Sequence, residues 1–488
     1  MPTWTALAAD LGASSGKVIA ASFDGSTLSV SDVHRFENEP VETLGALHWD
    51  ILRLYNEIKT GVRKGCLAHK NVASIGIDTW AVDFGLLDSS GRLLGNPYHY
   101  RDRRNDGVME SVIDKLTRKT IFEHCGLQFL PFNTVYQLAG MQQRGDEQLE
   151  RAQTMLMIPD LLGYFFTGEK VAEFTNATTT GLLEPGGGWS EFLLEKLKIP
   201  KRILPPIIQP GTVSAILPSA AEGLGTGRAK FVSVGTHDTA SAVAATPSSA
   251  ENFAYVSCGT WSLLGTEVKT PIVNDKALSL NFTNEGGVCG TYRLLKNIMG
   301  LWLLQELKRE WDRSGKNLSW AQITALSAQA PAFTAIIDPD DPRFMPPGDM
   351  SPRIREYCRE TNQKVPEGDG ALARCIIESL ALKYRWVLER MEELTGRKVP
   401  QLHMVGGGIQ NELLCQWAAD ACGRPVVAGP VEATALGNIA MQMIAAKEVS
   451  SLSQAREIIG RSLGVKRYEP KSSAEWNDAY GKLCALLK

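Results

Sequence analysis

Short apolar runs alternate with glycine-containing turns near the start of the chain. Between residues 5 and 36, the runs TALAAD, KVIAASF and TLSVSDVHRF are separated by LGASSG and DGST. Runs of this kind joined by tight turns are typical of antiparallel strands. The pattern therefore predicts a three-stranded meander.

A helix and a buried strand are predicted next. Between residues 48 and 69, apolar residues recur every three or four positions, as on one buried face of a helix: Ile51, Tyr55, Ile58, Val62 and Cys66. The following run, VASIGIDTW, is too apolar for a half-exposed strand and predicts a central one. Strands followed by a helix and a buried strand indicate an α/β layer.

The strand–turn–strand pattern returns later in the chain. The segment FAYVSCGTWSLLGTEV repeats the order of ALAADLGASSGKVIAASF, which predicts an internal duplication. Helices are expected from Asn297 to about Trp311 and from Ala371 to Leu394, and a strand is expected at QLHMV before three glycines. Residues 338–353 are rich in Pro and Asp and predict an ordered surface loop.

The balance of charge and polarity narrows the class of protein. The 488 residues allow roughly two to four domains, and 51 Lys and Arg against 54 Asp and Glu give a net charge of −3. No broad nucleic-acid or anionic-membrane surface is implied, and no apolar run is long enough to span a bilayer. The N-terminal stretch lacks a signal-peptide pattern, so a cytoplasmic location is expected.

The nine cysteines are scattered, odd in number and free of any CxxC pair. This pattern favours buried thiols in a reducing compartment over a zinc site or a disulfide framework. Cys358 and Cys375 flank a short polar stretch and could approach each other. A disulfide between them stays open as the alternative.

The segment DLGASSGK, from Asp10 to Lys17, is the first candidate for chemistry. It is not a Walker A loop, because Gly12 and Gly16 are one residue too close and Val18 replaces the required Ser or Thr. Small residues in a hairpin can still direct backbone N–H groups and hydroxyls towards an anion, and Asp10 could then reach a metal ion. The alternative is a structural hairpin, with Asp10 in an Asx turn and the glycines at positive φ.

The second candidate is VSVGTHDTASAV, in which His237 and Asp238 follow an apolar strand and precede a helix. An acid at this place is suited to act as a general base or a metal ligand. The alternative is that Asp238 or Thr239 caps the helix and His237 is structural.

The third candidate is the triple glycine at residues 406–408, after QLHMV. Asn411 stands where a dinucleotide-binding fingerprint needs glycine, so that fingerprint is disfavoured. Three glycines leave room for a flat group such as adenine, or alternatively for tight packing of a helix on a strand.

Two glycine-rich turns, one in each half, with an acid between them are a combination found in sugar kinases and actin-like ATPases. Along nearly the whole chain, the sequence resembles the FGGY family of carbohydrate kinases at DLGASSGK, SIGIDTWAVDF, YRDRR, GLQFLPFNTVYQL, FTNATTT, HDTASAV, CGTWSL, TNEGG, YRLLKNIMGLWLLQ, LHMVGGGIQN and AGPVEATALGN. Three narrower segments, IDTWAVDF, QFLPFNT and LKNIMGLWLLQ, are similar to ketose-binding segments of the family's L-rhamnulose kinases. The resemblance implies ATP-dependent phosphorylation of L-rhamnulose at its C1 hydroxyl.

The resemblance also implies the fold and the ligands. The expected fold is α/β, with two ribonuclease-H-like domains of the actin and sugar-kinase superfamily and the active site in the cleft between them. The expected domains are residues 1–245, with the sugar site and phosphate loop, and residues 246–488, with the nucleotide site. ATP, Mg²⁺ and a ketose are the implied ligands, with no nucleic-acid or membrane partner, and the protein is expected to be a monomer or a dimer.

Individual residues take roles by the same resemblance. Asp238 is the implied base and Asp10 positions magnesium. The implied ATP-binding residues are Gly12, Ala13, Ser14, Ser15, Gly16, Lys17, Thr260, Gln305 and Gly407, and the implied sugar-binding residues are Ala81, His237, Asp238, Thr239 and Asn297. From the residues alone, Asn297 could equally be a helix N-cap and Gln305 a solvated helix residue.

Two positions depart from the family pattern. Lys17 stands where Arg is usual, which keeps the positive charge but not the bidentate geometry towards phosphate. Ala81 stands where L-rhamnulose kinases typically have Gly, which adds a methyl group beside the implied sugar site. The alternatives that stay open are a kinase for another ketose, such as L-fuculose or L-xylulose, and a non-catalytic, chaperone-like ATPase.

Overall fold

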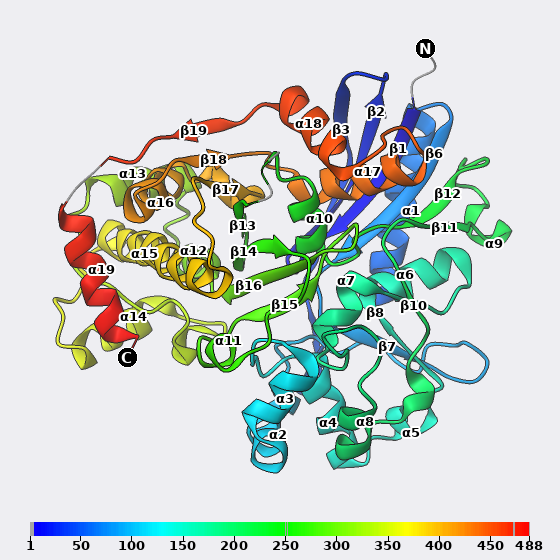
Figure 1. The fold of residues 1–488 in the computed structure, drawn as a ribbon, viewed down its shortest axis with the longest axis horizontal. Coiled ribbons are helices and arrows are strands. Elements are labelled where there is room, and N and C mark those ends of the chain that lie inside the picture. The colour runs from blue at the N-terminus through cyan, green and yellow to red at the C-terminus, as the bar shows by residue number, and fades with distance from the viewer. Residues whose placement is uncertain (1–3, 249, 251, 472–473, 488) are drawn as a thin grey trace. The chain divides into compact units, whose positions relative to one another are not determined.

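The computed structural model describes residues 4–248, 250, 252–471 and 474–487, and the chain divides into two compact units (Figure 1). Unit 1 comprises Met1–Ser249, Glu267–Leu294 and Ala433–Leu463, and unit 2 comprises Ala250–Thr266, Leu295–Glu432 and Gly464–Lys488. Each unit therefore combines segments that are far apart in the sequence. The predicted domains, residues 1–245 and 246–488, stay a prediction.

Six strands of unit 1 form one mixed sheet in the spatial order β11-β12-β6-β1-β2-β3: β1 (Trp4–Leu11), β2 (Ser15–Phe23), β3 (Leu28–Glu37), β6 (Val72–Thr79), β11 (Thr212–Ala215) and β12 (Lys230–Ser233). Strands β1, β2 and β3 pair antiparallel, which confirms the predicted meander. Strand β6 pairs in parallel with β1 on one side and with β12 on the other, so it is the predicted central strand.

Helices cover both faces of this sheet. Residues that alternate along β1, such as Leu7 and Ala9, pack against the apolar face of α1 (Ile51–Ala68), as its spacing predicts. On the opposite face, Gly76 of β6 lies directly against Asn438 of α17 (Ala433–Ala445). Two buried faces explain why VASIGIDTW is apolar almost throughout.

The remaining elements of unit 1 are short. They are β4 (Val41–Thr43), β5 (Ala46–His48), β7 (Phe84–Leu87), η1 (Arg103–Asn105), α2 (Val108–Leu116), α3 (Arg118–Cys125), α4 (Thr134–Arg144), α5 (Glu147–Arg151), β8 (Thr154–Met157), α6 (Ile158–Thr167), β9 (Ala172–Glu173), α7 (Phe174–Ala177), η2 (Thr178–Thr180), α8 (Glu191–Leu197), η3 (Lys201–Ile203), β10 (Ile207–Ile208), α9 (Pro218–Ala221), α10 (Asp238–Ala244), α11 (Asp275–Ser279), β15 (Thr283–Gly286) and α18 (Leu452–Leu463).

A second sheet repeats the plan of the first. Its spatial order is β15-β16-β14-β13-β17-β18-β19, where the strands not yet named are β13 (Ala254–Cys258), β14 (Ser262–Val268), β16 (Tyr292–Ile298), β17 (Leu402–Val405), β18 (Val426–Ala428) and β19 (Lys466–Tyr468). Like β1 and β2, β13 and β14 form an antiparallel hairpin, and β13 then pairs in parallel with β17 as β1 does with β6. Beyond β6 and beyond β17, each sheet continues with one parallel strand and then one antiparallel strand. The shared topology confirms the predicted duplication.

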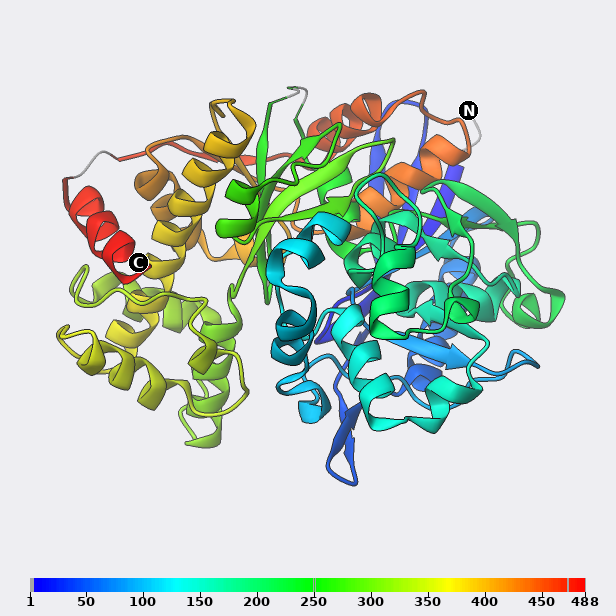
Figure 2. The ribbon, with the colours of Figure 1, turned by 60° about the horizontal axis from the view of Figure 1, so that its bottom comes forward.

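The helices of unit 2 are α12 (Trp302–Arg313), α13 (Trp320–Gln329), η4 (Pro342–Phe344), α14 (Met350–Glu360), α15 (Asp369–Thr395), η5 (Gly407–Gln410), α16 (Glu412–Cys422) and α19 (Ala474–Leu486). Helix α15 confirms the prediction for residues 371–394. The C-terminal helix α19, red in Figure 2, packs against α15 through an apolar cluster that includes Leu382, Trp476 and Leu483.

Two predictions about unit 2 were wrong in part. The helix expected from Asn297 begins at Trp302, because residues up to Ile298 continue strand β16 and Gly300 lies in the turn between them. The loop expected at residues 338–353 contains the short helix η4 and the first turn of α14, which tolerates Pro352 near its start.

The state of the cysteines and the character of the helices test the expectations about a disulfide and about a membrane span. All nine cysteines are free thiols, and Cys358 and Cys375 are buried and in hydrogen-bond contact with each other. Among the described residues, none of the helices combines the length and the apolar character that a membrane crossing needs.

Candidate active site

The hairpin between β1 and β2 contains the first predicted group of residues. Asp10 and Lys17 are register partners, and their side chains form an ion pair of 3.1 Å. The turn is closed by a hydrogen bond from the Gly12 amide to the Ser15 carbonyl, and the side chains of Ser14 and Ser15 are exposed. The predicted hairpin is confirmed, with exposed hydroxyls at its tip.

The two glycines of this hairpin are not explained by a positive φ, which was the alternative considered from the sequence. Neither Gly12 nor Gly16 has a positive φ. A Cβ atom at Gly16 would lie 2.2 Å from the ring of Phe36, whereas one at Gly12 would lie 3.5 Å from the Ser15 carbonyl, an ordinary contact. A side chain at position 16 would therefore displace the Phe36 ring, whereas one at position 12 would fit within the fold.

A second carboxylate, Asp78, lies beside Asp10 on the neighbouring strand β6. Its Oδ2 accepts a 2.6 Å hydrogen bond from the Asn438 side chain, and its Oδ1 is buried with no hydrogen-bond partner among the described residues. Burial, and next the charge of Asp10, raise the pKa of Asp78 well above its usual value. Asp78 was not among the site residues predicted from the sequence, although an acid within an otherwise apolar strand is a signal for a functional carboxylate.

Asp238 is the first residue of helix α10, and His237 stands at the N-cap position. The alternative in which Asp238 or Thr239 caps this helix is therefore wrong. The Asp238 side chain is 29% exposed, and its Oδ1 accepts a hydrogen bond from the Thr239 hydroxyl at 3.1 Å. Burial raises the pKa of Asp238; His237 opposes that rise and Asp10 adds to it. The structure thus brings together the predicted Asp10, His237, Asp238 and Thr239.

A fully buried carboxylate, Glu173, holds the turn that leads into α10. Its Oε2 accepts hydrogen bonds from the amide and the hydroxyl of Thr236, at 3.0 and 2.7 Å, and from the hydroxyl of Thr175. The Thr175 oxygen in turn accepts a bond from the His237 amide at 3.1 Å. These bonds fix the backbone directly before Asp238.

The turn after β6 contains the predicted residue Ala81. The backbone of Thr79 forms an isolated parallel β-bridge with that of His237. Ala81 follows two residues later and is half-exposed, so it lies near His237. Val82 has a φ of +68°, an unusual conformation for a β-branched residue. Its carbonyl accepts a bond of 2.6 Å from the Thr134 hydroxyl and another from the Gln137 amide. The surrounding contacts therefore hold this turn in a conformation that costs free energy.

Asp83 stabilises the same turn through hydrogen bonds, and it too was not predicted from the sequence as a site residue. Its carboxylate accepts four N–H donors, at 2.7 to 3.1 Å, from Trp49, Trp80, Tyr100 and Gln137. Burial raises the pKa of Asp83 to about 6, against the opposing effect of these donors. The two indoles give a signal for it, since a buried Trp N–H needs an acceptor.

In unit 2, Thr260 and Gln305, two of the residues implied to bind ATP, contact each other. Thr260 lies in the turn between β13 and β14, and its hydroxyl donates to the Gln305 Oε1 at 3.3 Å. Gln305 lies in the first turn of α12, which is anchored on this hairpin by the bond from the Trp302 amide to the Thr260 carbonyl.

The three glycines at residues 406–408 differ in their surroundings. Added Cβ atoms at Gly406 and Gly408 would lie 3.0 and 2.4 Å from atoms of Cys258, so these two glycines allow close packing. One at Gly407 would meet nothing within 4 Å in the described part of the chain. Only the middle glycine thus has open space beside it.

Asn297 is not at a helix start. It lies on strand β16, half-exposed, so the N-cap alternative for this residue is wrong. It belongs to unit 2, as do Thr260, Gln305 and Gly407, whereas the other predicted site residues belong to unit 1.

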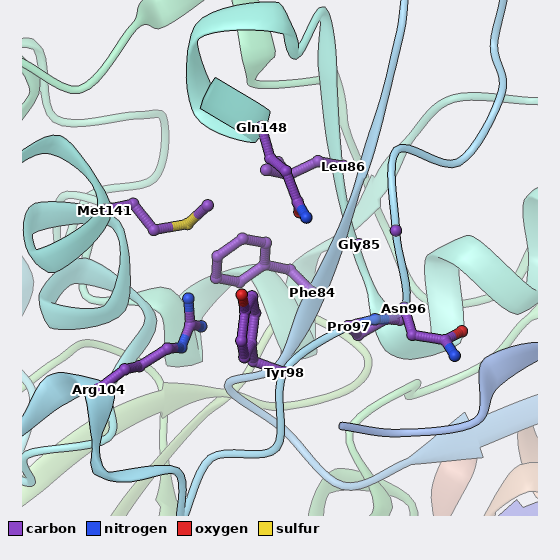
Figure 3. Close-up of a pocket in the computed structure, with 10 residues that line it drawn as sticks. Phe84, Gly85, Leu86, Asn96, Pro97, Tyr98, Arg104, Met141 and Gln148 are labelled. Atoms are coloured by element: carbon purple, nitrogen blue, oxygen red, sulfur yellow. The ribbon is translucent and has the colours of Figure 1, made fainter. Parts of the chain in front are cut away.

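A small pocket of unit 1 lies apart from these residues (Figure 3). Phe84, Gly85, Leu86, Gly95, Asn96, Pro97, Tyr98, Arg104, Met141 and Gln148 line it. The Arg104 guanidinium lies over the Tyr98 ring, at 3.7 Å from its centre. None of the predicted site residues is among its lining residues.

Comparison with known proteins identifies the family. The model of the N-terminal domain of the FGGY family of carbohydrate kinases matches residues 5–245, and that of the C-terminal domain matches residues 254–446. A rhamnulokinase of Pectobacterium atrosepticum is 44% identical over 98% of this chain and 96% of its own length. A rhamnulokinase of Bacteroides thetaiotaomicron is 41% identical over 97% of each chain.

Solved structures agree on the two-domain α/β fold. Gluconate kinase from Lactobacillus acidophilus superposes with a TM-score of 0.80 at 18% identity, over 99% of this chain and 97% of that one. Xylulose kinase from the same organism gives the same score and identity, over 99% of this chain and 96% of that one. The chain therefore belongs to the FGGY family of carbohydrate kinases and is a phosphotransferase that uses ATP to phosphorylate a sugar.

Proposed function

We propose that the chain transfers the γ-phosphoryl group of ATP to the C1 hydroxyl of L-rhamnulose, yielding L-rhamnulose 1-phosphate in L-rhamnose catabolism. The observation that carries the choice of sugar is the likeness to rhamnulokinases, at 41 to 45% identity over 95 to 98% of this chain. The narrower segments around Trp80, Phe132 and Asn297 support the same choice.

Asp238 acts as the general base in this proposal. Phosphoryl transfer proceeds through a loose, in-line transition state, so the protein mainly positions the reactants and balances charge. The Asp238 carboxylate is partly exposed at the start of α10, where it would accept the proton of the C1 hydroxyl as that oxygen attacks. A raised pKa makes this carboxylate a stronger base than a fully solvated aspartate.

The remaining predicted residues bind the two substrates. The hairpin residues Gly12, Ala13, Ser14, Ser15, Gly16 and Lys17 would hold the phosphates, with Thr260, Gln305 and Gly407 on the nucleotide. Exposed hydroxyls at the hairpin tip and the open space at Gly407 support these assignments. Ala81, His237, Thr239 and Asn297 would bind the sugar.

Magnesium is the proposed cofactor, with Asp10 as the residue that positions it. The donors present suit it: Asp10 and Asp78 are neighbouring carboxylates, and the buried Oδ1 of Asp78 has no partner in the described chain. Mg²⁺ prefers oxygen ligands and is commonly held by one or two carboxylates and the substrate phosphates. When bound, it would neutralise charge on the transferring phosphoryl group.

The reaction is expected in the cytoplasm, with the protein as a monomer or a dimer. Nine free thiols support a reducing compartment.

A coupled assay of ADP release tests the proposal, with L-rhamnulose, L-fuculose and L-xylulose as acceptors and a reaction without sugar. Turnover is expected to require a ketose, to be fastest with L-rhamnulose, and to fall about 100-fold or more in Asp238→Asn. The matched control is Asp114→Asn, an exposed carboxylate of α2 in the same unit. Sugar-independent turnover, another preferred ketose or an active Asp238→Asn would each contradict the proposal.

A further inference from the structure

A buried ionic cluster lies behind His237, on the side away from Asp238. Arg293 of β16 is completely buried, and its Nη2 lies 2.9 Å from Nδ1 of His237 and 3.1 Å from Oε2 of Glu285. The Arg293 Nε also donates to the Gly286 carbonyl at 2.8 Å. The His237 and Glu285 side chains are each only 7% exposed. All these residues belong to unit 1.

Arg293 determines which nitrogen of the imidazole carries the proton. A guanidinium group only donates hydrogen bonds, so the nitrogen that faces it at 2.9 Å has to accept. A proton on Nδ1 would place two donors against each other at 2.9 Å, and the Glu285 oxygen lies farther from Nδ1, at 3.4 Å. The neutral imidazole therefore carries its proton on Nε2.

The protonated nitrogen is the one that faces the proposed base. Nε2 of His237 lies 3.4 Å from Oδ1 of Asp238, and the Thr239 hydroxyl donates to the same oxygen. The Thr239 hydroxyl thus donates a hydrogen bond to Oδ1, and the Nε2–H of His237 adds a longer electrostatic attraction to the same oxygen. With the other tautomer, a lone pair would face the carboxylate and repel it.

We propose that Arg293 is a positioning residue that locks His237 in the tautomer protonated at Nε2, so that His237 orients the Asp238 carboxylate with Oδ2 towards the sugar hydroxyl. This inference rests on the proposed role of Asp238. It also gives a reason for a buried ion pair, which by itself contributes little to stability because of its desolvation cost.

The test compares two double variants that remove a buried Arg–Glu pair. Glu285→Gln with Arg293→Met removes the pair behind His237 without leaving an uncompensated buried charge. The control is Glu267→Gln with Arg456→Met, because Arg456 pairs with Glu267 and donates to the Val243 and Ala244 carbonyls at the other end of α10. Each pair is thus attached to one end of the same helix.

The first variant is expected to lose about 10- to 100-fold in kcat, with the KM for ATP nearly unchanged. The control should keep kcat within a few-fold even if both variants lose similar stability. A structural role alone would lower both alike. Equal kcat values for the two folded variants would overturn the inference.

The tautomer of His237 is also measurable directly in the wild-type protein, with no substitution at the site. In ¹⁵N-histidine NMR spectra, assigned through His237→Gln, Nδ1 of His237 is expected to be unprotonated and Nε2 protonated. Protonation of Nδ1 would overturn the inference even if the first double variant fails to fold. Full activity of Asp238→Asn would instead refute the proposed base, whatever the tautomer.

Discussion

Gly437 is the position at which one added methyl group should do most damage to the site. It lies on α17, which packs against α10, and a Cβ atom there would be 1.7 Å from the carbonyl oxygen of Ser241. Ordinary contact begins at 3.4 Å, so the Ser241 carbonyl and the new methyl group would have to move apart by about half of that distance. The obstacle is a backbone atom, which cannot move aside as the end of a flexible side chain can.

The expected cost of Gly437→Ala is about 3 kcal/mol, at the upper end of the usual range for overpacking a core. Separation of the helices would also weaken the adjacent bond between Asn438 and Asp78. Ser241 lies one turn after Asp238, so we expect kcat to fall as well, by about 100-fold if the carboxylate moves by roughly 1 Å.

Urea unfolding and the ketose-dependent ADP assay measure the two effects. The matched control is Gly481→Ala, a helical glycine of α19 whose added Cβ would meet nothing within 4 Å in the described chain. It should gain up to about 1 kcal/mol in helix propensity and keep full activity. A Gly437→Ala variant with wild-type stability and kcat would refute the reasoning.

Three further predictions concern the loops and one buried acid. Gly12→Ala fits the fold, since its Cβ would lie 3.5 Å from the nearest carbonyl. Weaker ATP binding by calorimetry would therefore show that the phosphates approach the backbone at residue 12, and an unchanged Kd for ATP would argue against this contact. Ala81→Gly should change the relative kcat/KM for L-rhamnulose, L-fuculose and L-xylulose by about 1 to 3 kcal/mol and leave the KM for ATP nearly fixed. The same order and ratios of kcat/KM in variant and wild type would mean that residue 81 does not touch the sugar. Burial, and next Glu173, raise the pKa of Asp160 well above 3.8, so the folded state retains a proton that the unfolded chain releases, and stability is lost as the pH rises from 3.8 through the folded pKa. Asp160→Asn should therefore gain stability relative to wild type as the pH rises above 3.8, measured by urea unfolding. Asp24→Asn should show no such gain, because hydrogen bonds, first from Thr27, lower the pKa of Asp24 and place its pH window below 3.8.

The local pattern of the chain was enough to predict the elements and their duplication. Apolar runs between glycine turns identified the meander, near-continuous apolarity identified the central strand β6, and three- and four-residue spacing identified α1 and α15. Burial of one face of a helix, or of both faces of a strand, leaves these patterns in the local sequence. The hairpin at Asp10 and the acid before α10 were also found, since strand ends and helix starts have local signals. The boundary errors at Asn297 and at residue 350 occurred where turns decide the ends of elements.

Tertiary structure alone decided which distant residues support the site. Asp78 meets Asn438 across 360 positions of sequence, and His237 meets Arg293 across 56. No periodicity encodes such pairs, because each partner satisfies its own strand or helix equally well without the other. Their contact depends on sheet order and on how helices cross, as at Gly437, where the space left by a missing side chain becomes visible only once α10 lies against it. The sequence by itself therefore determined the elements and the types of chemical groups, whereas the three-dimensional fold determined which of those groups are buried together and hold the proposed base in place.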